Sequence, residues 1–99
     1  MRVIAFRKLR EFWENPEFSE TETSLRVWYH EVKNADWTDS NEIKAHYQSA
    51  SIIGGGRIVF NIKGNAYRLV AAFDYQRQIA FIRFIGTHKE YDKINAKMI

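Results

Sequence analysis

The stretch from Arg57 to Asp74 constrains the fold more than any other part of this chain. Apolar and polar residues alternate over Arg57–Lys63, which is typical of a strand with one buried face. Gly64-Asn65 then offers a two-residue hairpin loop, with glycine first as a type II′ turn requires. Tyr67–Asp74 follows as the return strand. The sequence therefore predicts an antiparallel hairpin.

A two-residue loop also fixes which residues of the two strands face each other. It pairs Lys63 with Ala66, Ile62 with Tyr67 and Asn61 with Arg68. Ile58, Phe60, Ile62, Tyr67 and Leu69 then share the side that faces the core. The opposite side gathers Arg57, Asn61, Lys63 and Arg68.

The rest of the chain predicts helices first and strands later. We expect a first strand over Arg2–Phe6, helices over 8–14, 20–34 and 40–46, a third hairpin strand over Ile79–Thr87, and a short closing helix over His88–Asn95. Ser19 with Glu22, and Asp39 with Glu42, have the spacing of helix N-terminal caps. This order predicts an α+β fold over residues 1–99, one domain with helices packed on a small antiparallel meander.

Composition excludes several kinds of site and indicates where such a protein would act. The 99 residues include no cysteine, which excludes disulfides, thiolate metal ligands and cysteine nucleophiles. Apolar runs are too short to cross a bilayer, and the first residues do not resemble a signal peptide. A soluble, cytoplasmic protein is expected. The net charge of +3 favours polyanionic partners such as nucleic acid.

The residues predicted on the polar side of the hairpin suit phosphate binding. Three cations and an amide, Arg57, Lys63, Arg68 and Asn61, would lie on one face. Arginine can hold a phosphate through two donors. The alternative is an ordinary solvated outer face, which antiparallel sheets commonly have.

His88 is the most informative titratable residue. It follows the third hairpin strand and is close in sequence to Tyr91 and Asp92. Imidazole suits general acid or base chemistry near neutral pH, and a carboxylate could orient it. A surface or capping histidine is the alternative, and for His30 and His46, inside predicted helices, it is the preferred interpretation. No histidine pair has metal-ligand spacing, so no metal or cofactor is expected.

Several blocks of the chain resemble toxins of the HigB type, within the wider RelE-like group of toxin–antitoxin modules. The blocks are Ile4–Trp13, Trp28-Tyr29 with Ala35–Trp37, Arg57–Val70 and Ile82–Asp92. The resemblance implies a RelE-like fold that binds RNA on the face of the sheet and cuts messenger RNA, often on the ribosome. It also implies neutralisation by a HigA-like antitoxin, a helix-turn-helix protein.

The resemblance further implies site residues. Arg68 corresponds to a strand arginine that contacts the scissile phosphate, and His88 to a catalytic basic residue. Tyr91 and Asp92 complete the expected catalytic group, while Arg57, Asn61, Lys63 and Lys89 are the expected phosphate contacts. Two lysines that RelE carries on the preceding strand are replaced here by Val59 and Asn61, with Arg57 and Lys63 as the nearest cations.

The mechanism that follows is attack by a ribose 2′-oxygen on the adjacent phosphorus without a metal ion. Side chains would move the protons and stabilise the phosphate charge. The main alternative is a non-catalytic RNA-binding module that uses the same face only to hold phosphates. A domain that binds a protein partner is a third interpretation.

Overall fold

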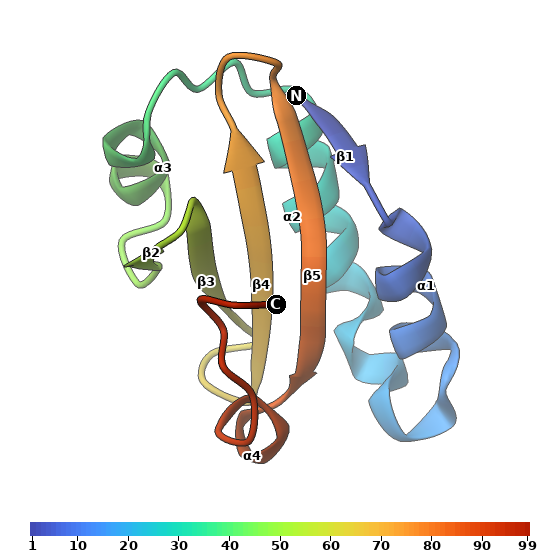
Figure 1. Cartoon of the computed structure of the whole chain (residues 1–99). Coiled ribbons are helices and arrows are strands. Elements are labelled where there is room, and N and C mark those ends of the chain that lie inside the picture. Colours follow the sequence, from blue (N-terminus) through green and yellow to red (C-terminus); the bar gives the residue numbers. More distant parts are fainter.

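One five-stranded sheet organises the computed structural model, which describes residues 1–99 (Figure 1). The strands are β1 (Arg2–Ile4), β2 (Ser51–Gly54), β3 (Arg57–Ile62), β4 (Tyr67–Asp74) and β5 (Ile79–Thr87). Their order across the sheet is β1-β5-β4-β3-β2. The pair β1–β5 is parallel, and the other pairs are antiparallel. The predicted α+β class and meander are confirmed.

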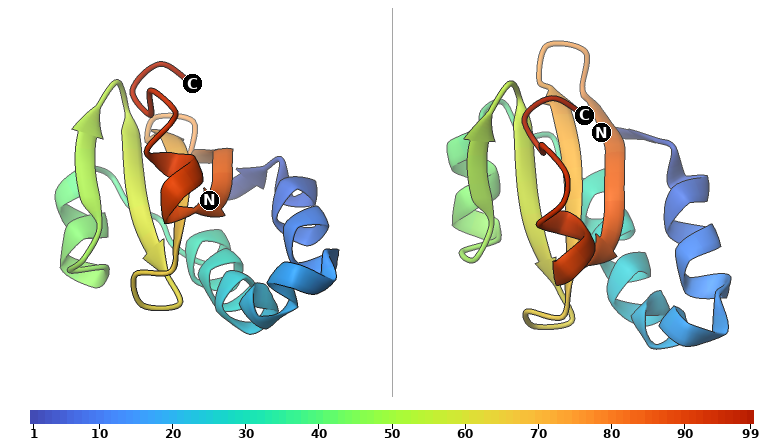
Figure 2. Two further views of the ribbon diagram at one scale, coloured as in Figure 1. Left: turned by 90° about the horizontal axis from the view of Figure 1, so that it is seen from below. Right: turned by 60° about the horizontal axis from the view of Figure 1, so that its bottom comes forward.

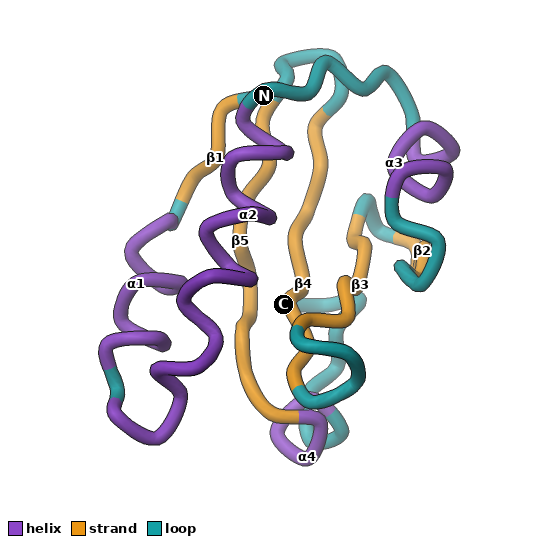
Figure 3. The backbone as a smooth tube through the Cα atoms, turned by 180° about the vertical axis from the view of Figure 1, so that it is seen from behind, coloured by secondary structure: helices purple, strands orange, loops and turns teal.

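Helices cover one face of this sheet, as Figure 3 shows from behind. They are α1 (Phe6–Glu14), the short 3₁₀ helix η1 (Pro16–Thr21), α2 (Glu22–Lys33) and, toward the β2 edge, α3 (Ser40–His46). The α2 face bearing Leu25, Trp28 and Val32 is buried against Phe60 and its neighbours. Trp13 and Trp37 are buried in the same core, so all three tryptophans pack in the interior. No helix has the length and apolarity needed to cross a membrane.

The predicted hairpin register is confirmed. Ile62 pairs with Tyr67 and Asn61 with Arg68, which places the apolar side of β3 and β4 in the core. Gly64 has the expected positive φ of 68°, but Lys63 also has a positive φ of 56°. Lys63 has therefore left the strand geometry, and the alternation that predicted its direction stops at Ile62.

Three local predictions are wrong or incomplete. Ser19 does not cap a helix: its hydroxyl donates to the Pro16 carbonyl within η1. The strand β2 was not predicted, because its residues show no alternation, and it pairs with β3 through an irregular register. The closing helix α4 spans only His88–Tyr91. The cap at Asp39 is confirmed, since its carboxylate accepts from the Glu42 N–H at 3.0 Å.

The face of the sheet opposite α1 and α2, called the outer face below, is not uniformly polar. Val59 and Val70 are buried there under Ala96, with Phe84, Tyr91 and Ile94 packed around them. Figure 2 shows α4 and the segment after it crossing this side of the sheet. We call residues 93–99 the closing segment. It starts from α4, at the end of the sheet where the β3–β4 loop lies.

Candidate functional site

Arg68 and Asn61 are directly opposite each other at the end of the sheet nearest the β3–β4 loop. The Arg68 guanidinium donates from Nη1 to the carbonyls of Asn65 at 2.9 Å and Tyr67 at 3.3 Å. These bonds hold the side chain along the β3–β4 loop. Its Nε and second terminal nitrogen make no hydrogen bond within the chain and are free to bind an anion.

The helix α4 begins beside this pair. On β5, Gly86 is the register partner of Arg68 and Thr87 that of Tyr67, so the chain enters α4 at the same end of the sheet. A capping box starts the helix: the Thr87 hydroxyl accepts from the Glu90 N–H at 3.2 Å, and the Glu90 carboxylate accepts from the Thr87 N–H at 2.9 Å. His88 is therefore held at the first position of a capped turn.

His88 and Asp92 face each other one turn apart. The distance from Nε2 of His88 to Oδ1 of Asp92 is 3.8 Å, an ion-pair distance when the imidazole is protonated. Both side chains are more than half exposed. A substrate can therefore reach the histidine.

Tyr91 and Lys89 complete the α4 contribution. The Tyr91 ring packs near Phe84, with centroids 6.4 Å apart, and its hydroxyl has no hydrogen-bond partner in the chain. Lys89 is exposed and makes no ion pair. Together with Arg68, Asn61, His88 and Asp92, these two residues form the group that we call the candidate site.

Gly86 makes this arrangement possible. A Cβ atom at this position would lie 2.6 Å from Cζ of Phe84 and 3.2 Å from a carboxylate oxygen of Glu90. A side chain would thus displace either the ring that supports Tyr91 or the carboxylate that caps α4. The glycine also leaves space beside its register partner Arg68.

Arg57, a predicted phosphate ligand, is not part of the candidate site. It lies four residues from Asn61 along β3, about 13 Å at the usual rise of a strand. Its guanidinium donates to the carbonyls of Ile99 and Gly55. Sequence alternation placed Arg57 on the correct face but could not show that the closing segment binds its guanidinium.

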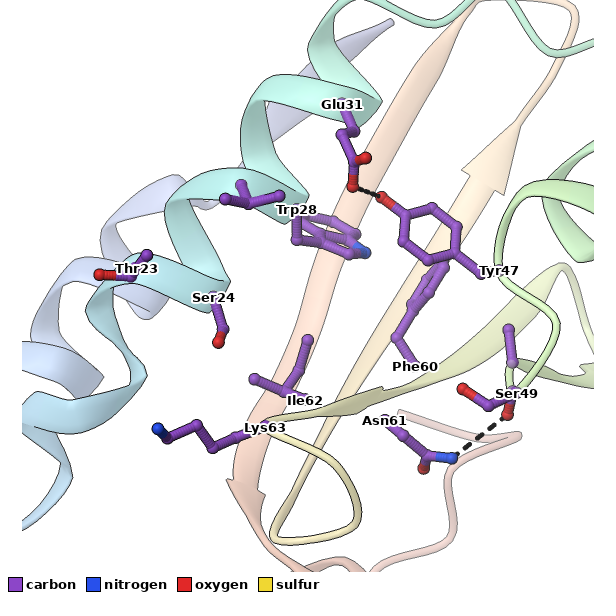
Figure 4. Close-up of a pocket in the computed structure, with 12 residues that line it drawn as sticks. Thr23, Ser24, Trp28, Glu31, Tyr47, Ser49, Phe60, Asn61, Ile62 and Lys63 are labelled. Carbon is purple, nitrogen blue, oxygen red and sulfur yellow. Dashed lines mark hydrogen bonds between the residues drawn. The ribbon is translucent and has the colours of Figure 1, made fainter.

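Lys63 is the second correction. Its positive φ removes it from the alternation of β3, and its side chain extends toward α2, where it lines a groove on the helical side of the sheet (Figure 4). The predicted set of three cations on one face is therefore wrong. Of these three, only Arg68 lies on the outer face at the end of the sheet where α4 begins.

The capping residues Thr87 and Glu90 were missed by sequence reasoning. Their spacing, a threonine followed three residues later by a glutamate, is the signal of a capping box and was visible in the sequence. The other histidines lie elsewhere: His30 is on α2, and His46 contacts Glu31 at 3.2 Å. The structure contains no group of three or more His, Asp or Glu side chains that could hold a metal ion.

Comparisons with known proteins match most of the chain to one family. A family model described as HigB_toxin, the RelE-like toxic component of a toxin–antitoxin system, matches residues 21–94. The mRNA interferase toxin HigB of Escherichia coli K12 and the mRNA interferase HigB of Shigella flexneri are similar to it. Each is 47% identical over 38 residues, which cover 38% of this chain and 36% of the relative. The aligned segment thus spans about a third of these curated relatives.

Proposed function

Because this chain belongs to the HigB family of RelE-like toxins, we propose that it is an endoribonuclease that cleaves messenger RNA. The observation that carries the proposal is that Arg68, whose register partner Gly86 lies two residues before His88, shares one end of the sheet with His88, Asp92 and the free Tyr91 hydroxyl. Cleavage of a phosphodiester requires a cation that binds the phosphate and groups that transfer protons, and this end of the sheet provides both. The names of the E. coli and Shigella relatives support RNA as the substrate.

The proposed reaction uses the RNA's own 2′-hydroxyl. A base removes its proton, the 2′-oxygen forms a bond to the adjacent phosphorus, and the bond from phosphorus to the 5′-oxygen breaks. An acid then protonates the leaving 5′-oxygen. The products are a 2′,3′-cyclic phosphate, which water can open to a 3′-phosphate, and a 5′-hydroxyl end.

Each side chain has a role in this scheme. His88 performs one of the two proton transfers, and Asp92 faces its Nε2 at 3.8 Å. Arg68 donates to the non-bridging phosphate oxygens, where negative charge grows in the transition state. Tyr91 offers a hydroxyl for the other proton transfer or for the phosphate. Asn61 and Lys89 bind the flanking RNA, and no metal ion takes part.

We also propose a HigA-like antitoxin as the partner and the translating ribosome as the place of cleavage. The family's description as part of a toxin–antitoxin system supports the first of these. Arg57, Lys63 and Arg68 lie in three different places and do not form one patch for a short acidic antitoxin segment. An antitoxin that blocks the candidate site directly must therefore act at Arg68 and α4.

Primer extension on messages translated in the presence of the protein tests the proposal. New 5′ ends should appear, they should persist in excess chelator, and the products should carry cyclic or 3′-phosphate ends. If the protein binds RNA and no message gains new ends, the chain is a non-catalytic RNA-binding module.

A further inference from the structure

A groove of about 280 Å³ lies on the helical side of the sheet, between α2, β3 and the segment that follows α3 (Figure 4). Trp28, Phe60 and Tyr47 provide aromatic walls, and Val27 lies at the rim with half of its surface exposed. Asn61 and Lys63 line the end nearest the β3–β4 loop. None of these residues except Asn61 belongs to the candidate site.

The groove and the candidate site meet at the edge of β3. The strand β2 pairs with β3 only as far as Val59, so no strand covers the edge from Phe60 to Ile62. Asn61 lines the groove and is also the register partner of Arg68. Directly paired residues have Cα atoms about 4.5–5.5 Å apart. A chain of linked nucleotides on Arg68 therefore passes close to the mouth of the groove.

Polar groups in the groove lack partners. Nε1 of Trp28 is buried and has no hydrogen-bond acceptor, and Figure 4 shows this nitrogen directed toward the Tyr47 side. The Lys63 ammonium makes no ion pair and no hydrogen bond within the chain. Oδ1 of Asn61 also accepts no hydrogen bond from another residue of the chain. Glu31, the only carboxylate in the lining, is occupied by the Tyr47 hydroxyl at 2.6 Å and His46 at 3.2 Å.

We propose that this groove holds one unpaired nucleobase of the RNA, from a nucleotide next to the one whose phosphate lies on Arg68. Trp28 and Phe60 are 2% and 1% exposed, so the base enters as the Tyr47 ring moves aside. It then stacks on the aromatic rings, and its carbonyl or ring nitrogen accepts from the Trp28 N–H. Lys63 then contacts the phosphate or the base edge. An apolar peptide side chain would leave the indole N–H and the ammonium without acceptors. The inference rests on the proposed function for its ligand.

Nuclear magnetic resonance of the whole protein tests this without measuring activity. Its three tryptophans give three indole N–H signals, of which Trp28 reports on the groove and Trp13 is the control in the core. The probes are the four nucleoside 5′-monophosphates, with ribose 5-phosphate as the control that lacks a base. The Trp28 signal should shift with at least one nucleotide and not with ribose 5-phosphate, while the Trp13 signal stays in place.

Lys63→Met should raise the dissociation constant of that nucleotide about tenfold, the loss expected for one charge-assisted hydrogen bond. Lys33→Met, which removes an exposed lysine on the same side of the molecule, should leave it unchanged. Equal shifts with ribose 5-phosphate would overturn the base subsite. The base subsite would also be overturned if the antitoxin shifted the Trp28 signal and no nucleotide did.

The two proposals can fail separately. If an RNA oligonucleotide shifts the Gly86 and His88 amide signals and leaves Trp28 unchanged, the groove is not a base subsite and the RNA-binding face stands. If neither region responds to RNA, the proposed function fails with it.

Discussion

His88 and Arg68 come from different elements, and neither side chain is part of a buried core. His88 is exposed on α4, and Arg68 projects from the outer face of β4. Truncating them opens no core cavity. Any effect of such truncations on RNA cleavage can therefore be separated from an effect on folding.

His88→Ala and Arg68→Ala should each reduce RNA cleavage strongly. Loss of a general acid or base costs about 10²–10⁴ in rate, and loss of a donor to a developing anion about 10²–10³. Cleavage rates of purified protein on a translated message provide the measurement. His30→Ala is the matched control, because His30 lies on the exposed side of α2 away from the candidate site. A folded His88→Ala protein that cleaves at the normal rate would shift the role to Tyr91 or Asp92.

The identities of the site residues were predictable from the sequence. The directions in which their side chains point were only partly predictable. Alternation placed Asn61 and Arg68 opposite each other correctly, because both lie inside regular strands. Lys63 was misplaced, because one positive φ at the end of β3 reverses the direction that alternation predicts. Arg57 was placed on the correct face, but its bond to Ile99 joins residues 42 positions apart, which local patterns do not report.

At the scale of elements, the capping box of α4 positions the histidine. A helix of four residues has little stability of its own, since its first turn costs more than it gains. The reciprocal bonds of Thr87 and Glu90 therefore determine where His88 and Asp92 lie.

Thr87→Val should lower the rate constant of cleavage while changing RNA binding less. Loss of an N-cap costs about 0.5–2 kcal/mol, enough to unwind so short a helix in part of the population. Separate measurement of kcat and KM checks this. Thr87→Ser keeps the hydroxyl and should restore the rate. Equal loss in the serine variant would show that the threonine methyl group, and not the cap, is what matters.

A second contact between elements joins α2 to the segment after α3. The Tyr47 hydroxyl donates to Glu31 at 2.6 Å, and burial, together with this carboxylate, raises the pKa of Tyr47 above its ordinary value of 10. In the unfolded chain Tyr47 ionises near pH 10, whereas in the folded protein it stays protonated. This contribution to stability is complete below pH 10 and declines as the pH rises beyond it.

Tyr47→Phe should therefore flatten the alkaline side of the stability curve. The difference in unfolding free energy between the native protein and the variant should be constant from pH 7 to 9 and shrink above pH 10. Urea denaturation at a series of pH values measures it. A difference that stays constant up to pH 11 would mean that Tyr47 ionises equally in both states.

Elements with a strong local pattern were predicted well, and those defined by distant partners were not. The hairpin of β3 and β4 follows from alternation and a glycine turn within one short stretch. In β2, the residues Ser51–Gly54 become a strand only because β3 offers a free edge. The predicted helix over His88–Asn95 stops at Tyr91, and Ile94 and Ala96 beyond it pack on the sheet.

At the scale of the whole molecule, the sheet has a core on each side. The larger core lies under α1 and α2, and the smaller one consists of Val59, Val70 and Ala96 with partly buried neighbours. The closing segment provides the cover for the smaller core, and its last residue bonds Arg57 across the sheet. Tyr91 packs against the same smaller core, so the closing segment and the candidate site contact the same apolar side chains.

Ala96→Asp should destabilise the protein by about 1–3 kcal/mol, because Ala96 is 8% exposed and a carboxylate there would lie against two valines without a partner. Met98→Asp introduces the same charge two residues away at a position 76% exposed, and should change stability by less than about 0.5 kcal/mol. For a domain of this size, the first change lowers the melting temperature by roughly 4–8 °C per kcal/mol. Thermal unfolding of both variants measures the difference, and binding of an apolar dye would report exposure of Val59 and Val70. If the two variants melt together, the closing segment does not cover the outer face in solution, and its bond to Arg57 does not hold it there.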